Sequence, residues 1–210
     1  MADEPRKRGR PPAYDSELAL AGARDVFWDF GYAASSLDEL SAAMAMNRPS
    51  VYGAFGDKEA LYLKTLERYR DDSLVALRAA LDPTLPLREG LAAVYAKSIE
   101  IYLGGLNAAR GCFLIGTATA EAVSRTAVRD ILRGSLQAFD AAIADRLRLA
   151  MERGEISAQA DPAALAVVAS AIMHSLAIRA RAGESRQELE ALARAGVALI
   201  CPNSAVRAGT

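Results

Sequence analysis

The sequence is poor in the side chains that metal sites and nucleophilic catalysis require. It has one histidine and two cysteines in 210 residues. Cys112 and Cys201 lie far apart and lack metal-ligand spacing, so we expect no metal site and two reduced thiols in a cytoplasmic protein. The sequence also shows no nucleophile–base pair and no phosphate-cradling glycine loop. We therefore expect no catalytic residue, no cofactor and no enzymatic activity.

Aromatic residues, charge of one sign and long apolar runs are also scarce. Aromatics make up 6% of the chain, whereas alanine and leucine, which favour helices, dominate. This composition predicts an all-α fold. The net charge of −1 gives no bulk attraction to nucleic acid, so a DNA-binding surface would have to be a local patch. No run of about 18 apolar residues lacks charge, and no apolar segment follows the basic N-terminus, which argues against a membrane span or a secretory signal.

Two short helices joined by a tight turn are predicted between residues 36 and 61. Ser36 and Glu39 can form a capping box at the start of the first helix, and the turn is Met44-Ala45-Met46. Asn47 is a suitable cap for the second helix, and Pro49 fits its first turn. The residues left for solvent or a partner are Arg48, Ser50, Tyr52 and Gly53. Such a short exposed helix is typical of the element that enters the DNA major groove.

This stretch resembles the helix-turn-helix of TetR-type (tetracycline-repressor-like) transcription regulators. The similarity runs without gaps from about Ala13 to Tyr69 and includes the Tyr-x-x-Phe of Tyr52 and Phe55 and the Asp-Lys-Glu-Ala-Leu that follows. It implies a homodimeric repressor that binds a pseudo-palindromic double-stranded DNA operator and is released by a small-molecule effector. The chain departs from the family at Ala45, where Gly is usual. If this position needs a positive φ, Ala costs roughly 1 kcal/mol there.

Side-chain chemistry and the resemblance together suggest roles within the motif. Arg48 could donate two parallel hydrogen bonds to guanine O6 and N7. The hydroxyls of Ser50 and Tyr52 suit phosphate oxygens, and Lys58 stands at a helix N-terminus that favours phosphate. Alternatively, Tyr52 could pack against the following helix. The candidate DNA-binding residues are Arg6, Lys7, Arg8, Arg10, Ser36, Asn47, Arg48, Pro49, Ser50, Tyr52, Gly53 and Lys58.

The run RKRGRPP directly precedes the motif. It could enter the minor groove as a basic arm, or it could be a solvated tail. We expect a basic arm (1–12), a helix-turn-helix domain (13–56), a helical effector-binding and dimerisation domain (57–202) and a flexible tail (203–210). Within the third part, 57–80 would be a connecting helix. Apolar periodicity, caps and helix-ending glycines and prolines predict about nine helices, including one at 112–123.

Two helices near the C-terminus carry apolar stripes among small residues. The resemblance implies that two subunits pair these helices into a four-helix bundle. An apolar stripe of this size would be an exposed patch in a monomer, although both stripes could instead pack only within the subunit. The candidate dimer residues are Leu165, Val168, Ile172, Leu176, Leu189, Leu192, Gly196 and Leu199.

The resemblance also implies a cavity among the middle helices for an effector of unknown identity. Each candidate could equally be an ordinary core residue. We expect His174 to be a hydrogen-bonded interior imidazole, because a lone histidine cannot form a metal site. The candidate effector-binding residues are Tyr95, Tyr102, Cys112, Phe113, Phe139, Met173 and His174, and Leu114 is a further candidate for the lining of the cavity.

Three other functions are left open by the sequence. Cys112 follows Arg110 and Gly111 at an expected helix start, where the helix dipole and a cation could lower a thiol pKa. This arrangement allows the hypothesis of a repressor that senses oxidants or electrophiles through Cys112, as some members of the family do; the alternative is that the thiol is a small core side chain. The chain could also be an all-helical enzyme or carrier, or an interaction module without DNA binding.

Overall fold

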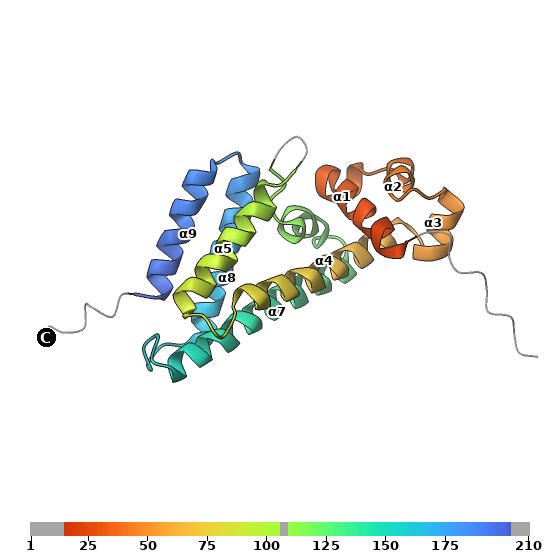
Figure 1. Cartoon of the computed structure of the whole chain (residues 1–210). Helices are drawn as coiled ribbons and strands as arrows, with labels where there is room; N and C mark the ends of the chain where they lie inside the picture. The colour runs from red at the N-terminus through yellow and green to blue at the C-terminus, as the bar shows by residue number, and fades with distance from the viewer. Residues whose placement is uncertain (1–14, 106–108, 203–210) are drawn as a thin grey trace, which may run out of the picture.

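The structure, a computed structural model, describes residues 15–105 and 109–202. Within these residues the chain forms nine α-helices, one π-helical segment and no strand, which confirms the predicted all-α fold (Figure 1). The elements are α1 (Ser16–Ala34), α2 (Leu37–Ala43), α3 (Arg48–Phe55), α4 (Lys58–Ala80), α5 (Leu87–Leu103), η1 (Leu114–Ala118), α6 (Thr119–Glu121), α7 (Thr126–Glu152), α8 (Pro162–Arg181) and α9 (Arg186–Ile200).

Local sequence signals account for the helix boundaries in the N-terminal part. Ser36 and Glu39 form the predicted capping box of α2, and the Asn47 side chain accepts a hydrogen bond from the Ser50 amide at the start of α3. Gly31 has a φ of 77° and breaks α1 near its end. Ala45, in the turn, has a φ of 50°, so the left-handed conformation that usually favours glycine is occupied by alanine here.

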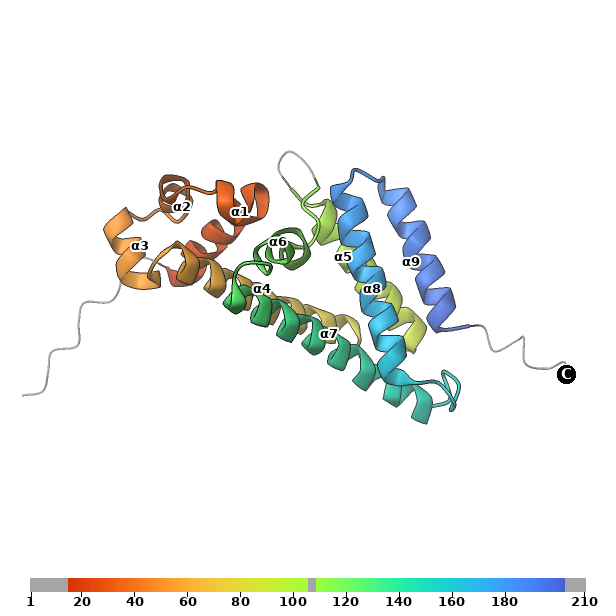
Figure 2. The same ribbon diagram turned by 180° about the vertical axis from the view of Figure 1, so that it is seen from behind.

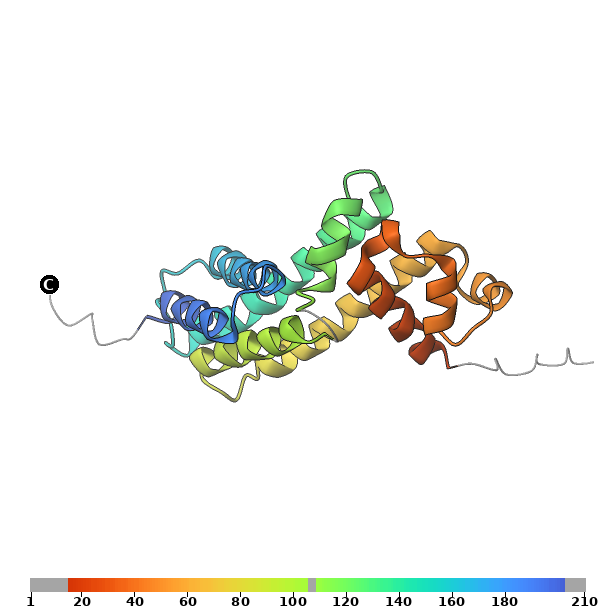
Figure 3. The ribbon, with the colours of Figure 1, turned by 90° about the horizontal axis from the view of Figure 1, so that it is seen from above.

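Helix α4 connects the two parts of the molecule as one continuous strut. Asp57 caps it through a hydrogen bond from the Ala60 amide, and its 23 residues span about 35 Å. Its first half packs against α1 and its later turns against α7, as Figures 1 and 2 both show. Seen from above, α1, α2 and α3 lie at one end of the molecule and α5, α8 and α9 at the other (Figure 3).

Helix α8 is long and apolar enough, by length and composition alone, to cross a membrane. Sequence inspection missed it, because Arg179 ends the apolar run just short of the length required. In the structure α8 packs against α5, α7 and α9, and 39% of its most apolar window is buried. Some of the apolar residues of α8 therefore face the protein core, as they do in the core helices of folded domains.

The expected continuous helix at 112–123 is wrong in detail. Its middle forms a π-helical segment, η1, which passes into the short α6. The Thr117 hydroxyl, itself buried, accepts a hydrogen bond from the Tyr62 hydroxyl of α4 and donates one to the Phe113 carbonyl, both at 2.8 Å. Helix propensity alone does not indicate such a wider turn. The π-helical turn of η1 lies at its contacts with α1, α4 and α8.

Candidate nucleic-acid interface

Helix α3 lies at the end of the molecule opposite α9, with its polar side exposed (Figures 1 and 2). Val51 and Phe55 face inward and are buried, as predicted. Tyr52 is 48% exposed, so about half of its side chain is accessible to a partner. The other exposed candidates on this helix are Arg48, Pro49, Ser50 and Gly53.

Some predicted contact residues are already engaged within the motif. The Ser36 hydroxyl oxygen accepts a hydrogen bond from the Glu39 amide at 3.2 Å, and the Asn47 side-chain oxygen accepts one from the Ser50 amide at 2.9 Å. These oxygens position the two helices, which leaves the hydroxyl hydrogen of Ser36 and the amide hydrogens of Asn47 for another partner. Arg6, Lys7, Arg8 and Arg10 lie outside the described residues.

Arg48 forms an ion pair with Asp38 across the two helices of the motif. Its Nε donates to Asp38 Oδ1 at 2.7 Å, and its Nη2 lies 2.5 Å from Oδ2. Both side chains are more than half exposed, and Asp38 raises the pKa of the guanidinium. Sequence inspection missed this partner, because the two residues meet only once α3 crosses α2. Arg48 must leave or share this carboxylate to contact a base.

Lys58, in the first turn of α4, is partly buried rather than fully extended into solvent. Its ammonium lies 4.6 Å from the centre of the Tyr32 ring, and burial lowers its pKa. Arg125 stacks on the same ring at 4.3 Å and pairs with Glu59 of α4 at 2.6 Å. Cations thus gather around the start of α4, where a helix N-terminus adds its own partial positive charge.

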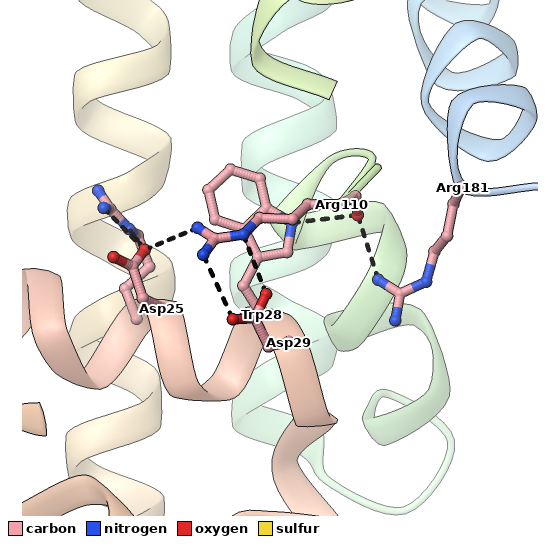
Figure 4. Close-up of polar contacts among 6 residues, drawn as sticks. Asp25, Trp28, Asp29, Arg110 and Arg181 are labelled. Carbon is pink, nitrogen blue, oxygen red and sulfur yellow. Dashed lines mark hydrogen bonds and ion pairs between the residues drawn. The ribbon is translucent and has the colours of Figure 1, made fainter. Parts of the chain in front are cut away.

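A single arginine, Arg110, joins the loop before η1 to helix α1 (Figure 4). Its Nη1 donates to Asp25 Oδ1 at 3.1 Å and its Nη2 donates to Asp29 Oδ2 at 3.3 Å, while its Nε lies 2.9 Å from Asp29 Oδ1 as an ion pair. The guanidinium also stands 5.5 Å from the Trp28 ring centre, and only 16% of the side chain is exposed. We call this arrangement of Arg110 with Asp25, Trp28 and Asp29 the Arg110 latch.

The backbone of Arg110 extends the latch to helix α8. The Trp28 indole N–H and Arg181 Nη1 each donate to the Arg110 carbonyl at 3.2 Å, as Figure 4 shows. Arg181 is near the end of α8. One loop residue therefore contacts the N-terminal helix through its side chain and both α1 and α8 through its carbonyl. The sequence carries no local signal for this contact, because its partners are more than 70 residues away.

Comparison with known proteins identifies the fold and its function class. The family described as bacterial regulatory proteins, tetR family, matches residues 19–65, and the tetracyclin repressor-like C-terminal domain matches residues 89–196, more than half of the chain. The chain belongs to the TetR family. It is therefore a DNA-binding transcriptional regulator, and neither an enzyme, a carrier nor a DNA-independent interaction module is supported by these matches.

Individual relatives of this TetR-family chain cover most of its length. It is 29% identical to the transcriptional repressor ComR of Escherichia coli K12 over 188 residues, and this alignment covers 90% of each protein. It is 30% identical to a cysteine mutant of the TetR-family regulator CifR, solved with 26 bp of operator DNA, at a TM-score of 0.76 over 90% of this chain and 98% of that one. A shorter match, 36% over 74 residues (35% of this chain, 34% of that one), is to the activator FasR of Mycolicibacterium smegmatis.

The C-terminal domain of this TetR-family chain contains a small, partly enclosed cavity of about 50 Å³ between α4, α5, η1, α7 and α8. Five of the seven predicted effector residues line it: Tyr102, Cys112, Phe139, Met173 and His174. Tyr95 and Phe113 do not, which corrects their assignment. Both are fully buried elsewhere, where the Tyr95 hydroxyl donates to the Ala169 carbonyl at 3.2 Å and Phe113 packs against Trp28.

Leu114, the further candidate for the lining, is also part of the cavity wall. The remaining residues of the wall were absent from the predicted set. Tyr69, Ser73 and Leu77 contribute one face of α4, with i, i+4, i+8 spacing that could have indicated a shared surface. The others are Ile115 and Leu136. His174 is half-buried and hydrogen-bonds to none of the described residues, so the expected hydrogen-bonded imidazole is not observed.

The thiol-sensing alternative is not favoured. Cys112 is buried, and burial raises its pKa rather than lowering it, although amides of η1 and the Tyr69 hydroxyl partly oppose that effect. The Arg110 guanidinium points towards α1 and is neutralised by two carboxylates, so it does not activate the thiol. A thiol that stays protonated and covered is a poor nucleophile.

The predicted dimer stripes are partly turned into the subunit. Leu176, Leu189 and Gly196 are buried, which corrects their assignment to an outer surface. A side chain at Gly196 would meet Ile172 at 2.7 Å, so this glycine allows α8 and α9 to approach closely. The apolar positions that α8 and α9 leave exposed are Ala163, Ala164, Val167, Val168, Ala171, Ile178, Ala191, Ala195, Ala198 and Leu199. Leu165 of α8 and Leu192 of α9, two further predicted dimer residues, are half-buried.

Proposed function

We propose that this chain is a homodimeric, cytoplasmic repressor that binds a pseudo-palindromic operator and is released by a small-molecule effector. The observation that carries this proposal is the exposed polar side of α3, held by capped helices at one end of a chain of the TetR family. The similarity to the repressor ComR and to CifR, which was solved on operator DNA, supports repression as the mode of action.

The role of each interface residue follows from its chemistry. Arg48 would break its ion pair with Asp38 and donate hydrogen bonds to the edge of a guanine. Ser50, Tyr52 and Lys58 would contact phosphates. A single short helix covers too few base pairs to select one site, so two copies related by a two-fold axis are needed. Exposed apolar positions on α8 and α9, including Val168 and Leu199, support pairing through these two helices.

Release would follow from a shift in the population of two arrangements of the DNA-reading units. The cavity wall and the Arg110 latch are adjacent in the chain, since Cys112 lines the cavity two residues after Arg110. We propose that an effector moves this loop and that the Arg110 latch transmits the movement to α1. The two α3 helices of the dimer would then no longer have the separation that the operator requires. The effector can act only to the extent that it binds the two arrangements with different affinity.

The test is selection of bound sequences from fragmented genomic DNA, followed by titration of the selected site across salt concentrations. Specific binding should weaken steeply as salt rises. Arg48→Ala should relax base preference by about 1–3 kcal/mol at one position, and Lys58→Ala should reduce the salt slope by about one while leaving the preference intact. Recovery of no common sequence, or of a site without two-fold symmetry, would contradict the proposal.

A further inference from the structure

The cavity wall has a chemical character that restricts its ligand. Its eleven residues include no Asp, Glu, Lys or Arg within the part of the chain that the structure describes. The nearest carboxylate that acts on it, Asp140, is not part of the wall and accepts a hydrogen bond from the Ser170 hydroxyl. A charged ligand would therefore lose its hydration without gaining a counter-ion.

The titratable side chains of the wall are also uncharged near neutral pH. Burial raises the pKa of the Tyr69 and Tyr102 phenols and of the Cys112 thiol, so each keeps its proton. Burial lowers the pKa of His174, although Asp140 partly opposes this, so the imidazole is neutral. The wall thus presents hydrogen-bonding groups of no net charge.

Two of these groups are available to a ligand. The Tyr69 hydroxyl donates to Cys112 Sγ at 3.6 Å, and sulfur is a weak acceptor that a ligand oxygen would replace with gain. His174 has no hydrogen-bond partner among the described residues, and one of its ring nitrogens can accept while the other donates. A single ligand hydroxyl or carbonyl could bind one or both.

The size of the cavity limits the ligand as well. At about 50 Å³ it is smaller than the roughly 150 Å³ that accommodates benzene in an apolar protein interior. Met173 is part of the wall, and methionine changes rotamer at little cost, so the cavity can widen when a ligand enters. A short aliphatic chain needs little widening, a single ring needs the cavity to grow to about the volume that holds benzene, and a long acyl chain would require the helices to separate.

We propose that this cavity takes a compact uncharged ligand, a single ring or short aliphatic chain that carries one hydroxyl or carbonyl. This inference rests on the proposed function, because it names the chemical class of the effector. Such a ligand would displace the Tyr69–Cys112 contact and so act on the loop that carries the Arg110 latch. A larger groove of about 590 Å³ between α5 and α9 is less suited, since Arg88, Glu100, Arg186, Glu190 and Arg194 line it.

The test uses three probes that share one ring and differ in charge: benzyl alcohol, benzoate and benzylamine, each at millimolar concentration and pH 7. We expect benzyl alcohol to raise the Tm of the full-length protein and to bind about 100-fold or more tightly than either ion, because burying an unpaired charge costs several kcal/mol. Leu136→Phe, which adds volume at the wall, should abolish the shift, whereas Leu132→Phe on the same helix should not.

A second pair of variants tests the hydrogen bond. Tyr69→Phe should weaken benzyl alcohol binding by about fivefold, the value of one neutral hydrogen bond. Tyr95→Phe removes a buried hydroxyl outside the cavity and should leave binding unchanged. Circular dichroism of each variant checks that it folds.

Three results would overturn the inference: equal binding of an ionic probe, no binding of any probe, or a benzyl alcohol shift that survives Leu136→Phe. Operator binding by the unliganded protein, measured in the same samples, tests the proposed function separately. Operator binding with no uptake of benzyl alcohol would reject only the ligand class. Loss of operator binding would reject the regulator itself.

Discussion

Replacing Ala45 by glycine should stabilise this protein, although the residue is exposed and makes no side-chain contact of note. Ala45 has a φ of 50°, in the left-handed region, where Cβ crowds the backbone of an L-residue. Relief of that crowding is worth about 1–2 kcal/mol. Glycine returns about 0.4–1 kcal/mol of this through the greater freedom of the unfolded chain. We expect a net gain of about 0.5–1 kcal/mol.

For a chain of this length, that gain corresponds to a rise in Tm of about 1–4 °C. The assay is thermal unfolding followed by circular dichroism, with every variant at the same protein concentration because dimerisation would make Tm concentration-dependent. Ala42→Gly is the matched control. Ala42 is equally exposed but lies within α2, so glycine there should lower stability by about 0.5–1 kcal/mol.

The two substitutions differ only in backbone conformation, so the sign of each effect is the decisive result. If Ala45→Gly lowers Tm, or if both variants shift in the same direction, the crowding at Ala45 does not control the stability of the turn. Unchanged operator affinity in Ala45→Gly would show that the gain is one of stability alone.

Three further predictions concern the interface, the latch and the dimer. Asp38→Asn should tighten operator binding by up to about fivefold, as measured by fluorescence anisotropy, because it frees Arg48 from an exposed ion pair worth at most about 1 kcal/mol. Weaker binding would mean that Asp38 positions Arg48 for DNA. Arg110→Ala should lower the free energy of unfolding in urea by about 1–3 kcal/mol, since it removes the cation between two carboxylates, and an unchanged value would exclude a structural latch. Leu199→Glu, at a position 69% exposed, should shift sedimentation towards the monomer. Arg194→Gln in α9, which makes the same change in net charge, is the control. A dimer that survives Leu199→Glu would place the interface elsewhere.

Sequence reasoning succeeded where the relevant interactions are local. The capping box of Ser36 and Glu39 and the cap at Asn47 each join residues three positions apart, and all are present. The strut α4 begins and ends within a residue of its predicted bounds for the same reason. Apolar spacing on α3 also predicted correctly which side is buried, because an isolated short helix has only one way to cover Val51 and Phe55.

It failed where neighbours distant in the chain decide the outcome. The sequence could not decide whether Arg110 activates Cys112 or the thiol is a core side chain, because that guanidinium turns to α1 and the thiol is covered by Tyr69. Leu176 and Leu189 belong to apolar stripes that read as exposed, but these helices have apolar residues on more than one face, and periodicity does not tell which face meets the core.

The sequence by itself determined most of the helix boundaries, the family and the exposed side of α3, because caps, turn residues and helical periodicity act over a few residues. Only the tertiary structure decided the pairing of Arg48 with Asp38, the Arg110 latch, the uncharged cavity and the exposed face of α8 and α9. These depend on which helices cross and at what rotation. That choice is made by the packing of the whole core, in which side chains far apart in the chain compete for the same space.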